Sequence, residues 1–348
     1  MSFPRVAFVY PNSRRELVAE VARGEAPDST LLGQNHLAGL GIDATIHEPR
    51  LTRAPRSGLA HRLTWNLREL TLPWELRDVD VAFTPLANLL PLAARARRRP
   101  RVVVVNYGLN LIYERSTRPR RRLLAESLRS AAAVVCLGES QREQLLEQTG
   151  LEPARVHTAL LGIDERFFLP RTPPEQGEPY VLTVGKDLSR DFAAFVEAVR
   201  RLGVRAELAV YPRNLEGIEL PPNARARVVG PAELRDLYAG AACVVIPQRR
   251  PEHPYGSEGG GLTSLLESMA MARPTVISDR PILHDYVSEG ENAVIVPPED
   301  PAALAAAIER VLGDPGSLGV AARRRVEAEL TTRHLAERLV PILRGAAR

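Results

Sequence analysis

The chain has 348 residues, which is longer than a single hydrophobic core usually supports, so two domains are expected. Apolar residues make up 45% of the chain and charged residues 25%, as in an ordinary globular protein. The net charge is only +4, and the basic runs at 95–101 and 118–122 have no interleaved aromatic residues for stacking on bases. Nucleic acid is therefore not an expected partner.

No stretch of the chain approaches the ~20 apolar residues that a membrane-spanning helix needs. The first residues, MSFPRVAFVYP, predict a strand and lack the basic prefix of a leader peptide. Cys136 and Cys243 lie far apart in apolar runs, without metal-ligand spacing, so we expect buried thiols in a reducing compartment. The sequence thus predicts a cytoplasmic protein without a zinc or disulfide framework.

Short apolar runs alternate with longer amphipathic segments along almost the whole chain. Continuous apolar strands joined by helices are typical of parallel sheets that are covered on both faces. The segments 128–140 and 237–249 share one pattern, a helix end, small residues, a buried strand and a polar loop, which favours two doubly wound domains in tandem. The predicted strands are 6–10, 44–48, 80–84, 102–106, 133–138, 180–185, 206–211, 227–231, 243–247, 275–279 and 293–297.

The segment 256–274, GSEGGGLTSLLESMAMARP, is the strongest candidate for a binding site. The glycines at 259–261 follow a predicted strand and begin a predicted helix, whose first N–H groups have no intrahelical partner and suit a phosphate group. Thr263 and Ser264 add hydroxyl groups in the first turn. Glu267 lies one turn further, where a carboxylate can accept hydrogen bonds from ribose hydroxyls. The simpler interpretation is a flexible loop with Glu267 on the solvated surface.

A second candidate is YVLTVGKDLSRDF (180–192), a predicted strand, a tight turn and a helix start. Ligands of doubly wound sheets bind outside the carboxyl ends of the strands. Lys186, the only lysine in the chain, and Arg190 lie at such an end, where two cations can neutralise a diphosphate and stabilise the charge on a departing nucleotide. In the simpler interpretation, Lys186 forms a surface ion pair with Asp187 or Asp191.

From about residue 130 to 330 the chain resembles the retaining glycosyltransferases of the GT-B fold, family 4. The blocks that carry the resemblance include VGKDLSRDF, VVGPAELRDLYAGAACVVIP, LLESMAMARPTVIS and VSEGENAVIVPPEDPAALAAAI. It implies an α/β fold of two Rossmann-like domains facing across a cleft. The implied acceptor domain spans 1–168 and the nucleotide-sugar domain 169–330, and the helix at 331–348 can pack back on the first domain. The donor-binding residues that follow are Gly185, Lys186, Arg190, Gly259, Gly260, Gly261, Leu262, Thr263 and Glu267.

Two positions depart from the family pattern. The family has two glutamates separated by seven residues, and the position that matches the first of them is Gly259, with Glu258 next to it. Either the loop bulges so that Glu258 contacts the donor sugar, or backbone amides replace the carboxylate. The family histidine near the reacting carbon is replaced by Asn106, which cannot act as a general base but can bond sugar hydroxyls. With Lys186 and Arg190, Asn106 and Glu258 complete the predicted catalytic set.

The first domain offers weaker candidates for contact with an acceptor. The loop YPNSRRE (10–16) contains Asn12, Arg14 and Arg15, and the segment 24–37 contains Asp28, Ser29, Asn35 and His36. A lone histidine such as His36 is more often a packing residue than a catalytic one. The stretch 59–76 has tryptophan, leucine and arginine at helical spacing, which fits core packing or a weak contact with the inner membrane surface.

The sequence therefore predicts a glycosyltransferase that moves a sugar from a nucleoside diphosphate sugar to an unidentified glycan, lipid-linked or small-molecule acceptor. Retention is implied by the resemblance, through front-face attack assisted by the leaving phosphate. We expect no cofactor beyond the UDP- or GDP-sugar co-substrate and no metal, because cationic residues and a helix N-terminus supply the charge. The alternatives are a nucleotide-sugar epimerase or hydrolase, and a non-catalytic subunit that binds sugar nucleotides.

Overall fold

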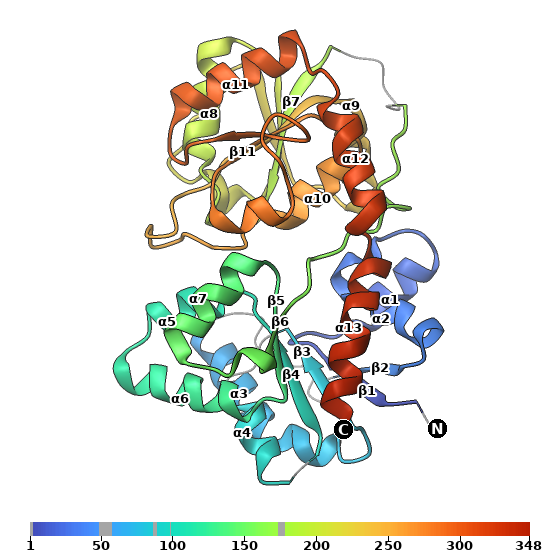
Figure 1. Ribbon diagram of the computed structural model, residues 1–348. Helices are drawn as coiled ribbons and strands as arrows, with labels where there is room; N and C mark the ends of the chain where they lie inside the picture. The colour runs from blue at the N-terminus through green and yellow to red at the C-terminus, as the bar shows by residue number, and fades with distance from the viewer. Residues whose placement is uncertain (1–2, 49–57, 86–88, 98, 173–177) are drawn as a thin grey trace. The chain divides into compact units, whose positions relative to one another are not determined.

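A computed structural model describes residues 3–48, 58–85, 89–97, 99–172 and 178–348, with the side chains of 58–66 left aside. The chain forms two compact units (Figure 1). The first unit consists of Met1–Ala22, Thr30–Leu160 and Thr332–Arg348, and the second of Arg23–Ser29 and Leu161–Thr331. The C-terminal segment thus belongs to the first unit, where helix α13 (Thr332–Ala347) packs against α2, β3 and β4.

The first unit contains a parallel six-stranded sheet with the order β2-β1-β3-β4-β5-β6. Apolar side chains from its helices and strands form a core cluster, which includes Leu72, Leu128 and Leu145. The strands are β1 (Arg5–Val9), β2 (Asp43–His47), β3 (Val81–Thr84), β4 (Arg101–Val105), β5 (Ala133–Cys136) and β6 (Val156–Thr158). The other helices are α1 (Arg15–Ala22), α2 (Gln34–Leu37), α3 (Gly58–Glu75), α4 (Leu90–Arg95), α5 (Leu109–Glu114), α6 (Arg118–Ser130) and α7 (Glu139–Thr149).

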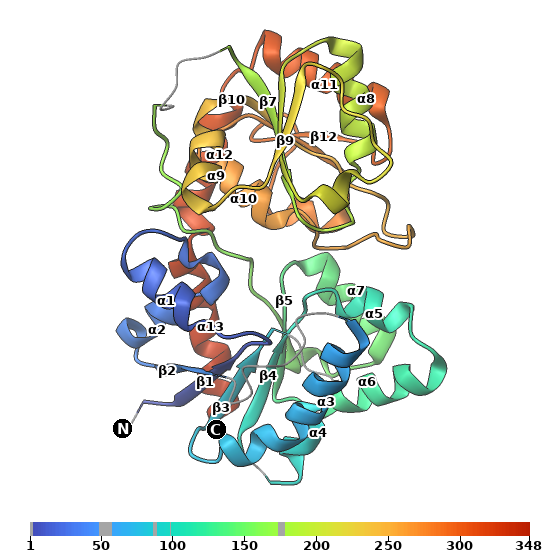
Figure 2. The same cartoon turned by 180° about the vertical axis from the view of Figure 1, so that it is seen from behind.

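The second unit contains another parallel six-stranded sheet, with the order β12-β11-β10-β7-β8-β9. Figure 2 shows this sheet from behind, with β7 and β9 in view. Its strands are β7 (Tyr180–Gly185), β8 (Ala206–Val210), β9 (Ala224–Arg227), β10 (Ala241–Ile246), β11 (Thr275–Ser278) and β12 (Val294–Val296). Its helices are α8 (Phe192–Leu202), α9 (Pro231–Gly240), α10 (Leu262–Ala270), α11 (Pro301–Gly313) and α12 (Leu318–Glu329).

The strand order of the second sheet reverses between β7 and β10, because the chain runs outward through β8 and β9 and then returns to the other side of β7. Ligands of doubly wound sheets bind at the carboxyl ends of the strands that flank such a reversal. The loops after β7 and β10 are therefore the first place to look for a binding site.

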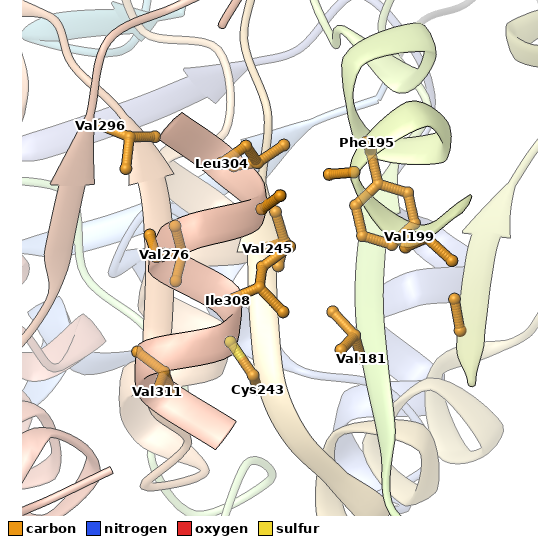
Figure 3. Close-up of a cluster of buried hydrophobic side chains, with 14 of the residues drawn as sticks. Val181, Phe195, Val199, Cys243, Val245, Val276, Val296, Leu304, Ile308 and Val311 are labelled. Carbon is orange, nitrogen blue, oxygen red and sulfur yellow. The ribbon is translucent and has the colours of Figure 1, made fainter. Parts of the chain in front are cut away.

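Helices α8 and α11 lie side by side and cover one face of the second sheet (Figure 3). Phe195 and Val199 of α8 and Ile308 of α11 are fully buried against strand residues such as Val245. Each such side chain contributes on the order of 2 kcal/mol by its burial. This core fixes the strands from which the loops of the candidate site start.

The fold class agrees with the sequence-based expectation of two parallel, doubly wound α/β domains. The strand expected at 227–231 is displaced: β9 ends at Arg227, and Pro231, which has no N–H to donate, begins α9. Strand β6 was not predicted, because three residues at a sheet edge leave no clear apolar run. Cys136 and Cys243 are buried and form no disulfide bond, as expected. In the described part of the chain, the helices are too short or too polar to cross a membrane.

Candidate functional site

The loop after β7 brings a buried arginine to the carboxyl edge of the second sheet. A Cβ atom at Gly185 would lie 2.5 Å from Nε of Arg190, so only glycine lets this side chain cross the strand end. Arg190 donates from Nη2 to Oγ of Ser264 at 2.9 Å, and its Nε lies 3.4 Å from a carboxylate oxygen of Asp187. Its Nη1 has no hydrogen-bond partner among the described residues.

The charged side chain of Arg190 is buried, and only 3% of the residue's surface is exposed. Burial lowers the pKa of its guanidinium, while the nearby Asp187, Tyr238 and Glu267 act in the opposite direction. A buried guanidinium with an unused donor is suited to an anionic ligand, because such a ligand supplies both a counter-charge and an acceptor.

Lys186 is exposed, whereas the backbone around it is fixed. Its carbonyl oxygen accepts a hydrogen bond from Nη2 of Arg213 at 3.1 Å, and its Nζ lies 5.2 Å from the ring centroid of Tyr211. Asp187 pairs with Arg190, and Asp191 caps α8 by accepting from the Ala194 amide at 3.1 Å. The simpler interpretation, an ion pair between Lys186 and either aspartate, is therefore not what the structure contains.

The glycine-containing loop before α10 packs directly on the loop after β7. Gly261 has φ +83°, and a Cβ there would lie 2.7 Å from both Nη1 of Arg190 and Nε2 of Gln248. A Cβ at Gly260 would lie 2.5 Å from Oγ of Ser189. Gly259 is different, because the nearest atom to its Cβ position is 3.9 Å away. Two of the three glycines are therefore required by close packing.

Helix α10 begins at Leu262, which is buried, and its first turn presents two hydroxyl groups in different ways. Thr263 is exposed. Ser264 is buried and bonds to Arg190, which ties the start of the helix to the loop after β7. Glu258, in the preceding loop, is half-buried. The helix N-terminus, Lys186 and Arg190 thus belong to one cluster at the edge of the sheet.

Glu267 is buried, and not on the solvated surface as the simpler interpretation held. Its carboxylate accepts a hydrogen bond from the hydroxyl of Tyr238 at 2.8 Å. Burial raises the pKa of Glu267 to about 7, although the Tyr238 hydrogen bond and the charges of Arg190 and Lys186 act to lower it. The pKa of this carboxyl group therefore lies near neutral pH.

A pocket lies beside this cluster, at the carboxyl ends of β7 and β8. Its walls are mostly apolar, and Lys186 and Glu267 contribute the charged groups. The sequence patterns did not single out the apolar wall residues, since they come from the ends of different strands and from α9, and the strand order brings these together. These wall residues include Val184, Tyr211, Val228 and Leu234.

Asn106, expected to contact a sugar, has another role in the first unit. It is fully buried, its Oδ1 accepts from the Leu109 amide at 2.7 Å, and its Nδ2 donates to Oδ1 of Asn110 at 2.7 Å. Both ends of the amide are used to hold the start of α5. Tyr107, the next residue of this turn, reaches the surface and is 37% exposed.

Three of the weaker acceptor candidates also have structural partners. His36 bonds to the hydroxyl of Thr332 at 3.0 Å, and Oγ of Ser29 accepts from the Asp164 amide at 3.1 Å. The guanidinium of Arg14 stacks 4.6 Å from the ring centroid of Tyr10. These contacts favour packing over substrate recognition.

The stretch 59–76 forms α3, and its first part lies outside the described side chains. Leu72 and Leu76 are buried, whereas Leu67 and Trp74 are exposed. The guanidinium of Arg97 lies 3.8 Å from the Trp74 ring centroid. Core packing thus accounts for the apolar residues on the buried face of α3, and it does not account for those on the exposed face.

Both halves of the chain match known sequence families. Residues 5–167 match Glycosyltransferase Family 4, and residues 178–314 match Glycosyl transferases group 1. Among curated proteins, alpha-D-kanosaminyltransferase of Streptomyces kanamyceticus is 25% identical over 231 residues, 59% of this chain and 57% of that protein. D-inositol 3-phosphate glycosyltransferase 1 of Catenulispora acidiphila is 28% identical over 266 residues, 65% of this chain and 62% of that protein. The matches thus span about three fifths of these relatives.

Solved structures share the fold at low sequence identity. A glycosyltransferase from Rickettsia africae has a TM-score of 0.72 and 14% identity, with 99% of each chain covered. Sucrose-phosphate synthase from Thermosynechococcus elongatus has a TM-score of 0.72 and 18% identity, with 98% of each chain covered. Anabaena HepE, solved with UDP and glucose, has a TM-score of 0.71 and 14% identity, with 97% of this chain and 99% of HepE covered. The chain therefore resembles two glycosyltransferase families in sequence and shares the GT-B fold with these solved structures.

Proposed function

We propose that the protein transfers a sugar from a nucleoside diphosphate sugar to an acceptor. The observation that carries the proposal is the cluster at the carboxyl edge of the second sheet, where Lys186, Arg190 and the start of α10 adjoin a pocket that contains Glu267. Two cationic side chains and the N-terminus of a helix lie together, and the carboxyl group of Glu267 belongs to the same helix. This arrangement suits a nucleotide, with its anionic diphosphate, its ribose hydroxyls and its flat base.

Each part of the donor has a proposed partner. Lys186, Arg190 and the backbone of Gly260, Gly261, Leu262 and Thr263 bind the diphosphate, since cations and helix N-termini favour negative charge. Glu267 accepts hydrogen bonds from the ribose hydroxyls. The base lies between the apolar walls of the pocket beside Val184 and Val228.

The chemistry follows from the placement of these charges. When the bond between the anomeric carbon and the diphosphate oxygen breaks, the leaving group gains negative charge, which Lys186, Arg190 and the α10 dipole stabilise. We propose retention without a metal, with the acceptor hydroxyl attacking from the front face and giving its proton to the leaving phosphate. This scheme requires no general base in the first unit, in keeping with the buried Asn106.

The donor sugar lies, in this proposal, beside the loop of Glu258 and Gly259. The carboxylate of Glu258 accepts hydrogen bonds from the sugar hydroxyls, and the open space at Gly259 leaves room for the sugar ring. Glu258→Gln is expected to lower turnover while leaving the affinity for the nucleoside diphosphate unchanged. Equal turnover in both proteins would assign sugar binding to the backbone amides.

A donor-consumption assay tests the function. UDP- and GDP-sugars are incubated with the protein, with and without a panel of glycan, lipid-linked and small-molecule acceptors, and the nucleotide and sugar products are measured. Transfer predicts nucleotide release that depends on an acceptor, a glycoside with the donor's anomeric configuration, and activity that survives a chelator. Conversion of the donor alone would identify an epimerase or hydrolase, and tight donor binding without turnover would identify a binding subunit.

A further inference from the structure

A second buried guanidinium lies at the same edge of the sheet and has no assigned role. Arg280 follows β11, the strand next to β10, and only 4% of its surface is exposed. Its Nη1 donates to the carbonyl oxygen of Ser257 at 3.5 Å, a long bond. Its Nε and Nη2 are buried without a hydrogen-bond partner among the described residues. Burying a charge in this way costs free energy unless a counter-charge or a hydrogen-bond acceptor compensates for it.

The neighbours of Arg280 increase that cost. Burial and, to a lesser extent, the positive charge of Arg190 together lower its pKa to about 9, against the opposite effect of Asp187 and Asp279. Asp187 is already paired with Arg190, and Asp279 is half-exposed, 3.2 Å from Nε2 of His284. Two like charges are therefore buried near each other with little compensation from carboxylates.

The unused donors come from three adjacent strands. Arg190 follows β7, Gln248 follows β10 and Arg280 follows β11, and β10 lies between the other two. Nε2 of Gln248 is also buried without a hydrogen-bond partner in the described ranges, and its backbone amide donates to Oγ of Ser278 at 3.0 Å. Residues of the loop at 257–261 touch all three side chains. The unused donors thus belong to side chains that lie around the loop at 257–261, and the described residues give these donors no acceptor.

We propose that Arg280 is a third cationic ligand of the donor's pyrophosphate group, which binds against Arg190, Gln248 and Arg280 when the loop at 257–261 shifts. This inference rests on the proposed function. Pyrophosphate supplies several oxygens and more than one negative charge, which matches an excess of N–H donors and two buried guanidinium groups. A third cation also favours the departed nucleotide over the intact donor, since cleavage adds negative charge to the leaving group.

The test uses the full chain, inorganic pyrophosphate and inorganic phosphate, in calorimetric titrations and thermal melts. Arg280→Met is expected to weaken pyrophosphate binding roughly tenfold or more, and Arg280→Lys less. The melting temperature of ligand-free Arg280→Met should stay equal or rise, because an uncompensated buried charge is removed. A residue that only supports the fold would not give this combination.

Arg273→Met is the matched control, because Arg273 precedes the same strand at the opposite edge of the sheet. Its Nε and Nη1 donate to the carbonyl oxygens of Met271 and Ala241, at 3.2 and 3.3 Å. This control should lower the melting temperature and keep wild-type affinity for pyrophosphate. Unchanged pyrophosphate affinity in Arg280→Met overturns the inference alone. A wild-type protein that binds neither pyrophosphate nor any nucleoside diphosphate overturns both this inference and the proposed function.

Discussion

Glu267 combines a buried carboxyl group with two cations, Arg190 and Lys186, that are close enough to act on it. Its hydrogen bond with Tyr238 fixes the side chain, and burial raises its pKa to about 7. In the proposed binding mode, the two hydroxyl donors of the ribose favour the ionised carboxylate, and nucleotide binding is then linked to loss of the Glu267 proton.

This raised pKa predicts a specific pH dependence of stability. The folded pKa lies above the unfolded value, so the stabilisation is fully present below about pH 4.5 and is lost as the pH rises through about 7. The effect amounts to at most about 3 kcal/mol. Denaturant unfolding between pH 5 and 8 should show that Glu267→Gln gains on the wild type as the pH rises. Parallel pH profiles for the two proteins would contradict the assigned pKa.

Lys186 offers the cleanest test of charge at the site, because its side chain is exposed and its replacement leaves the core intact. Lys186→Ala should lower the affinity for the nucleoside diphosphate about ten- to hundredfold and abolish transfer, with the melting temperature unchanged. Lys186→Arg keeps the charge and serves as the control. Wild-type affinity in Lys186→Ala, measured by calorimetry, would remove this residue from the site.

At the scale of elements, the site depends on two loops that interlock. Arg190 passes Gly185 to reach Ser264, and Gly261 approaches Arg190 and Gln248 closely. The order of the strands brings these loops together, since β7 and β10 are neighbours although the chain visits β8 and β9 between them. The binding geometry is thus set by backbone packing before any ligand contact is made.

Gly261→Ala and Gly259→Ala form a matched pair that tests this interlock. At Gly261 the positive φ and the 2.7 Å approach to two side-chain nitrogens predict a loss of about 1–3 kcal/mol in the free energy of unfolding, with weaker nucleotide binding. At Gly259 the nearest atom is 3.9 Å away, so alanine should change the stability little. Chemical denaturation measures both, and equal losses in the two variants would contradict the packing described.

Some residues of the candidate site could be predicted from the sequence and others could not, for physical reasons. Lys186 and Arg190 lie in the loop that follows Gly185, and Glu267 lies in the helix that follows the glycines at 259–261, so local pattern carries information there. Arg280 is one of many arginines in the chain, and only its buried neighbours, which follow other strands, indicate that it can bind a ligand. The position of Asn106 after a strand does not reveal that its buried amide accepts from Leu109 at the start of α5, and its contact with a sugar stays a prediction.

At the scale of the whole molecule, both units are parallel doubly wound domains, and the fold persists in solved structures at 14–18% identity. Fold is therefore a weaker guide to the reaction than the charges of the second unit. The departures from the family pattern, at Glu258, Gly259 and Asn106, concern the handling of the sugar. The residues that we propose to bind the diphosphate, Lys186 and Arg190, match the pattern of the resembled family.

The central claim, that the second unit binds a nucleoside diphosphate, is tested most directly by calorimetric titration of the intact chain. UDP and GDP are compared with UMP and GMP at one pH and salt concentration. We predict that one of the diphosphates binds with a stoichiometry of one per chain, roughly tenfold or more tighter than its monophosphate. Equal affinity for the monophosphate, or no binding of either diphosphate, would contradict the account.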